Sequence, residues 1–107
     1  MLSLVLLALA GTSPAPNTGA IDRSRSAYRS CLQQASTSAK PPAVTADKFA
    51  DYARAQCAAQ QQALTAAMVE FDMRNGASRK SATAGADMAV EDYLETAKNN
   101  FAARLPN

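Results

Sequence analysis

Residues 27–58 read AYRSCLQQASTSAKPPAVTADKFADYARAQCA, and they contain both cysteines of the chain, Cys31 and Cys57. Each cysteine lies in an Ala-rich stretch whose apolar residues recur at helical spacing, and Lys40-Pro41-Pro42 separates the two stretches because proline disfavours helical geometry before it. Helices joined by a short connection pack antiparallel. The sequence therefore predicts a helical hairpin in which a Cys31–Cys57 disulfide joins the two helices.

Three interpretations of the cysteine pair are open from the sequence: a structural disulfide, two free buried thiols, or a redox or catalytic thiol. The pair is not a C-x-x-C motif, and the chain has no histidine to activate a thiolate. A metal site would need two further soft ligands. We favour the disulfide, for which the chain-entropy model gives about 3.5 kcal/mol of stabilisation.

Apolar positions outside the hairpin extend the pattern to three helices, over about 21–38, 45–75 and 85–104. No stretch shows the alternation typical of strands, so the sequence predicts an all-α, antiparallel three-helix bundle formed by one domain, 21–107. The three stripes are Ile21, Tyr28, Cys31, Leu32 and Ala35; Phe49, Tyr52, Ala53, Gln56, Cys57, Gln60, Leu64, Met68 and Phe71; and Ala86, Val90, Tyr93, Leu94, Ala97, Phe101 and Leu105.

Helix ends are marked by residues with known positional preferences. Thr18 is suited to cap the first helix, and Asn75-Gly76 is suited to end the second, because glycine adopts the left-handed conformation without a steric penalty. Small and basic residues over 76–83 indicate a loop before the third helix. In this register the third helix brings Phe101 near Gln60.

The first 20 residues are predicted to be a signal peptide and a short linker. Residues 2–10 (LSLVLLALA) form an apolar run, followed by small and helix-breaking residues. Nine helical residues span about 14 Å, about half of the hydrocarbon core of a membrane. Cleavage after Ala10 and after Ala20 both fit the small-residue rule, and the alternative is an apolar arm packed on the domain. We expect a periplasmic or secreted protein without a membrane span in its mature form.

Composition limits the chemistry available to the chain. Of the 107 residues 25 are Ala, and from residue 21 onward only 19 are Cys, Val, Ile, Leu, Met, Phe or Tyr, so the core is thin. Eleven basic residues against nine acidic ones do not indicate nucleic-acid binding. The absence of histidine removes the usual proton shuttle and the commonest metal ligand. We expect neither enzymatic activity nor a cofactor.

A metal site could be sought in Asp87, Glu91 and Glu95, which follow one helix face at intervals of four residues. Three carboxylates could bind a hard cation, but no loop supplies carbonyl ligands and no EF-hand pattern is present. Acidic residues also suit the N-terminal half of a helix because they complement its dipole. We therefore predict no metal site.

A binding surface is suggested by side chains with an apolar body and a polar or adaptable end: Tyr28, Tyr52, Tyr93 and Met68. They could line a ligand pocket or contact a partner protein. The alternative is that they belong to the core and its edge, with the tyrosine hydroxyl groups turned to water.

Residues 27–32 (AYRSCL), the Pro-containing connection and residues 53–58 (ARAQCA) resemble small exported two-cysteine helical proteins of unassigned function, as in alphaproteobacteria. The resemblance covers about residues 21–71. It implies a periplasmic or secreted location and supplies no catalytic residues.

Taken with the missing catalytic chemistry, these features favour a non-catalytic protein that contacts an unknown protein partner in the bacterial envelope. Two alternatives are a bundle that binds a small ligand or lipid, and an envelope stress chaperone or inhibitor.

Overall fold

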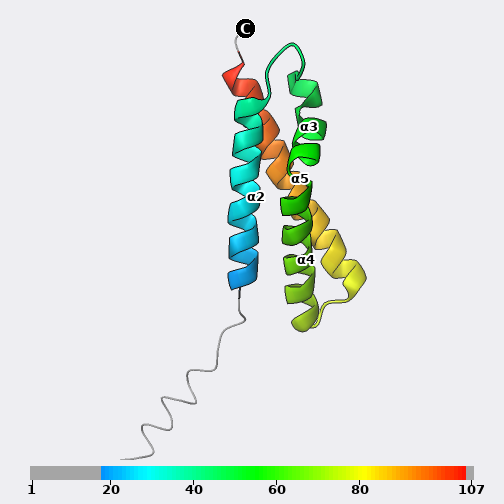
Figure 1. Cartoon of the computed structure of the whole chain (residues 1–107). Helices are drawn as coiled ribbons and strands as arrows, with labels where there is room; N and C mark the ends of the chain where they lie inside the picture. The colour runs from blue at the N-terminus through cyan, green and yellow to red at the C-terminus, as the bar shows by residue number, and fades with distance from the viewer. Residues whose placement is uncertain (1–17, 106–107) are drawn as a thin grey trace, which may run out of the picture.

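The computed structural model describes residues 18–105, which form helices and the turns between them (Figure 1). The predicted signal peptide lies almost entirely outside this range. The all-α class is confirmed. The helices are α2 (Gly19–Ser38), α3 (Phe49–Gln56), α4 (Ala58–Arg74) and α5 (Arg79–Arg104), and a 3₁₀ turn, η1 (Ala46–Lys48), precedes α3.

The helices are arranged as a hairpin crossed by a fourth element (Figure 1). α2 runs in one direction, and α3 and α4 follow each other back along it. α5 then crosses obliquely and ends near the C-terminal end of α2, so that it contacts α2, α3 and α4. As a result, α2 and α5 run in the same general direction.

The prediction of three helices is wrong, because the predicted helix over 45–75 is divided at Cys57. The backbone of Cys57 has φ −114° and ψ 23°, outside helical geometry, although Cys57 N–H still donates to Ala53 O at 2.9 Å. Neither proline nor glycine occurs over 43–75. The interruption falls on Cys57, the residue that is covalently tied to α2.

The last helix begins at Arg79, six residues before the predicted start at Gly85. Ser78 provides the reason, because its hydroxyl oxygen accepts a hydrogen bond from the backbone N–H of Ser81 at 3.1 Å and so caps α5. Because α5 starts earlier, its residues lie opposite other residues of the hairpin than the sequence predicted. Phe101 stacks on Phe49 at a centroid distance of 4.6 Å, so its predicted position near Gln60 is wrong.

The turn between α4 and α5 confirms the stop predicted at Gly76. Gly76 has φ +101°, its N–H donates to Met73 O at 3.1 Å, and Ala77 N–H donates to Asp72 O at 2.9 Å. This pair of bonds is the Schellman motif, which satisfies the last carbonyls of α4. At the start of α2, in contrast, the hydroxyl of Thr18 donates to the Asp22 carboxylate at 3.1 Å and does not cap a backbone N–H.

The predicted Cys31–Cys57 disulfide is present, with the two Cα atoms 5.8 Å apart. It joins α2 to the junction of α3 and α4, next to the core. The largest fully buried side chains come from all four helices and from this junction: Tyr28, Phe49, Cys57, Leu64 and Leu94.

Candidate functional site

A groove of about 640 Å³ lies between α2 and the C-terminal half of α5. Its floor is apolar, because Leu32 is buried and Tyr93 and Ala97 are half-buried. Its rim is polar. The described residues that line it are Arg29, Leu32, Gln33 and Ser36 from α2, and Tyr93, Thr96, Ala97, Asn100, Ala103 and Arg104 from α5.

Helical periodicity explains why these residues share one groove. Four lining residues of α2 (29, 32, 33 and 36) and four of α5 (93, 96, 97 and 100) each follow the spacing i, i+3, i+4, i+7. Residues at this spacing form one face of a helix. The groove is therefore the meeting place of two helix faces, each with an apolar centre and polar edges.

Two arginines give the groove its charge. Arg29 and Arg104 are both exposed, and neither has a carboxylate within ion-pair distance among residues 18–105. Arg104 donates from Nε to Asn100 O at 3.3 Å. None of the described lining residues is acidic. The groove thus carries positive charge without an internal counter-ion in the described part of the chain.

Of the arginines outside the groove, three have acidic partners, whereas Arg23 and Arg79 have none among residues 18–105. Arg25 lies 3.5 Å from Asp22 and Arg74 lies 4.0 Å from Glu70, in both cases within one helix. Arg54, on α3, pairs with carboxylates on α3 and α5.

Ser36 places a buried hydroxyl group in the groove wall. The residue is 9% exposed, and its Oγ has no hydrogen-bond partner among the described residues. A buried hydroxyl without a partner costs about 1–3 kcal/mol. A bound molecule with an acceptor or donor at this point would remove that cost.

Tyr93 connects the groove to the core. Its ring meets the ring of Tyr28 edge to face, with the centroids 5.9 Å apart. Tyr28 is fully buried, and its hydroxyl has no hydrogen-bond partner in the described structure. Burial raises the pKa of Tyr28 to about 12, while Arg54 opposes the rise and Glu91 adds to it. Tyr28 therefore supports the floor of the groove from beneath.

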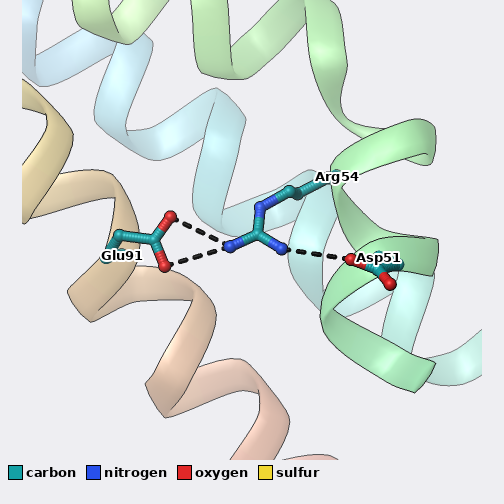
Figure 2. Close-up of polar contacts among 3 residues, drawn as sticks. All are labelled: Asp51, Arg54 and Glu91. Carbon is teal, nitrogen blue, oxygen red and sulfur yellow. Dashed lines mark hydrogen bonds and ion pairs between the residues drawn. The ribbon is translucent and has the colours of Figure 1, made fainter. Parts of the chain in front are cut away.

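A second polar cluster lies outside the groove, where α3 meets α5 (Figure 2). Arg54 donates from Nη2 to both carboxylate oxygens of Glu91, at 2.9 and 3.0 Å, and from Nη1 to Asp51 at 3.3 Å. The hydrogen bond to Glu91 is the main cause that raises the pKa of Arg54. All groups of the cluster are partly exposed, so we assign it to holding α5 against α3.

Glu91 is also a member of the acidic row that it forms with Asp87 and Glu95. In the structure its carboxylate is engaged by Arg54. Over residues 18–105, no three His, Cys, Asp or Glu side chains lie together in a way that could hold a metal ion.

The four residues proposed as a binding surface lie in different environments. Tyr93 lines the groove, and Tyr28 lies beneath it without exposed surface. Tyr52 lies beside Phe49, and its hydroxyl shares a hydrogen bond with Ser38 Oγ at 2.8 Å. Met68 is half-buried and packs against the core. The structure thus brings Tyr28 and Tyr93 together and places the other two outside the groove.

Sequence reasoning missed polar residues of the groove, above all Ser36 and Arg104. The signal was present in the spacing. Ser36 follows Leu32 by four residues and so occupies a position on the apolar stripe, where a polar residue calls for an explanation. The pairing of the two faces was not visible, because it depends on the crossing of α5 over α2.

No helix among residues 18–105 combines the length and the apolar character needed to cross a membrane. Comparisons with models of known protein families, with curated proteins and with solved structures find no match to this chain.

Proposed function

We propose that this chain is a non-catalytic exported protein that acts by contact with another protein in the bacterial envelope. The observation that carries the proposal is the groove between α2 and α5. It combines an apolar floor with a polar rim, which is the anatomy of a protein–protein contact site.

The scaffold around the groove suits a binding role. The disulfide fixes α2 to the α3–α4 junction, and Arg54 links α3 to α5 through Glu91. The two helices that form the groove are therefore each tied to the middle of the molecule. A preorganised surface loses less conformational entropy when a partner binds.

Two features support an exported location. Disulfides persist mainly in oxidising compartments such as the periplasm and the extracellular space. The apolar run over residues 2–10, with small residues after it, has the form of a signal peptide. The resemblance of residues 21–71 to small exported two-cysteine helical proteins agrees with both.

Site-specific photo-crosslinking tests the proposal. A photo-reactive residue is introduced into the full chain at Gln33 or Asn100, on the two rims of the groove, or at Gln62, which is exposed on α4 away from it. We expect both groove positions to give an adduct with the same protein and the control position to give none. No adduct, or equal adducts from all three positions, would contradict the proposal.

The volume of the groove favours a second candidate, a carrier of a small amphipathic ligand. About 640 Å³ falls within the range of about 300–1,000 Å³ that is usual for small-molecule sites. Native mass spectrometry of protein recovered from its own compartment distinguishes the two. A carrier shows a defined mass increment that solvent extraction removes, whereas a protein-binding module shows the mass of the chain alone.

A further inference from the structure

We infer that the groove between α2 and α5 binds an acidic amphipathic helix of a partner protein, with Arg29 and Arg104 pairing with carboxylates that flank the helix's apolar stripe. This inference rests on the proposed function and names the chemistry of the partner. It is carried by the charge and the shape of the groove together.

The dimensions of the groove match a short helix. Its lining residues on α5 extend from Tyr93 to Arg104, which corresponds to about 16 Å, or three helical turns. The walls are themselves two helices that run in the same general direction (Figure 1). A third helix laid between them would complete a local bundle, which is how amphipathic helices bind in apolar grooves.

The floor favours close approach of such a helix. Ala97 and Ala103 project only methyl groups from α5, and Leu32 and Tyr93 supply larger apolar surfaces beside them. Short side chains let helix axes approach closely, whereas the larger ones fill the spaces between an incoming row of Leu or Ile. The hydroxyl of Ser36 can then donate to a polar atom at the edge of that row.

The charge of the groove selects the sign of the partner. Arg29 and Arg104 lie at its two ends and have no carboxylate partner among the described residues. Acidic residues on both ends of the incoming stripe would satisfy both guanidinium groups, which form strong hydrogen bonds with carboxylates. A basic helix would meet repulsion at the same two places.

Arg104 also lies in the last turn of α5, where a cation is favourable for the helix dipole in the absence of any partner. Arg29 lies in the middle of α2, where the helix dipole gives a cation no such advantage. A test must therefore measure binding and not stability alone.

Fluorescence anisotropy tests the inference with the oxidised protein obtained from the full chain. The probe is a labelled peptide of about 15 residues, the length at which an isolated helix becomes marginally stable in water, with Leu at i, i+3, i+4 and i+7 and Glu at both ends of the Leu stripe. A matched peptide carries Lys in place of every Glu. Dodecanoate serves as a competitor that offers a carboxylate and an acyl chain without a helix.

Two variants test the groove, and a third is a control for the change of charge. R29E/R104E reverses both groove arginines, and A103W fills the groove without a change of charge. R23E/R79E makes the same charge reversal at exposed arginines outside this groove. Circular dichroism establishes that each variant is folded.

We expect the acidic peptide to bind more tightly than the basic one, and the preference to weaken as salt is added. The groove reversal should weaken binding by about tenfold or more, while the control reversal changes it by less than about twofold. A103W should also weaken binding.

Several results would overturn the inference: no binding of either peptide, equal binding of both, or equal losses in the groove and control reversals. Binding of dodecanoate at the expense of the peptide would assign the groove to a small amphipath instead. If these results occur while Gln33 and Asn100 still crosslink to one envelope protein, the proposed function stands and only the chemistry assigned to the partner fails.

Discussion

Replacement of Tyr28 by phenylalanine should stabilise this protein, although Tyr28 is one of its most deeply buried side chains. The residue is 0% exposed, and its hydroxyl has no hydrogen-bond partner among the described residues. Such a group costs about 1–3 kcal/mol when buried. Phenylalanine keeps the ring and its edge-to-face contact with Tyr93. We therefore expect Tyr28→Phe to raise the free energy of unfolding by about 1–2 kcal/mol.

The same burial predicts a dependence of stability on alkaline pH. The pKa of Tyr28 is about 12 in the folded protein, against an ordinary value of 10.0. Above pH 10 the unfolded chain releases this proton while the folded protein retains it, so stability falls as pH rises. The stability linked to this proton is fully present below pH 10. It falls by up to about 3 kcal/mol between about pH 10 and 12. Tyr28→Phe should lack this part of the fall.

Urea unfolding followed by far-UV circular dichroism, at neutral pH and at several alkaline values, measures both effects. Tyr52→Phe is the matched control, because the hydroxyl of Tyr52 has a partner, Ser38 Oγ, at 2.8 Å. That variant should lose about 0.5–1 kcal/mol. If Tyr28→Phe instead destabilises the protein as much as Tyr52→Phe does, the hydroxyl of Tyr28 has a partner and the reasoning is wrong.

Three further predictions concern the covalent tie, a glycine and the exposed ion pairs. Removal of the disulfide by C31A/C57A should lower the free energy of unfolding by about 3–4 kcal/mol, measured by urea unfolding against the oxidised protein. Gly85→Ala should raise the free energy of unfolding by about 0.5–1 kcal/mol, because Gly85 is helical and nothing lies within 4 Å of the added Cβ. The measurement is a higher midpoint of thermal unfolding. A double-mutant cycle of Arg54→Ala and Glu91→Ala should give a coupling of about 0.5–1 kcal/mol that shrinks with salt, and a coupling near zero would contradict our assignment of this pair to holding α5.

Local signals in the sequence were sufficient for the helical class, the disulfide and two helix ends. Pro41 and Pro42 act on the residues directly before them, and α2 ends at Ser38 as predicted. Gly76 acts through its own backbone, and α4 stops there in the predicted manner. These features depend on one or two residues each, so tertiary structure has little opportunity to override them.

The features that sequence reasoning missed depend on competition between neighbours or on distant contacts. Gly85 was expected to begin the last helix, but the cap at Ser78 starts α5 earlier, and a single exposed glycine within a helix costs only about 1 kcal/mol relative to alanine. The bend at Cys57 arises where the chain is tied to α2, and nothing local marks it. The wrong partner predicted for Phe101 followed from the wrong start predicted for α5.

The groove and the thinness of the core have a common origin. On α5, the residues that face α2 at the C-terminal end include Ala97 and Ala103, whose methyl groups are too short to fill the space between two helices that cross. Larger residues of α5, Leu94 and Phe101, are buried instead in the common core, where Phe101 stacks on the α3 side chain Phe49. α5 is thus packed on one side and open on the other. Because the disulfide supplies stability that does not depend on filling this gap, the fold can keep an open face between α2 and α5 that a bundle held by packing alone would have to close.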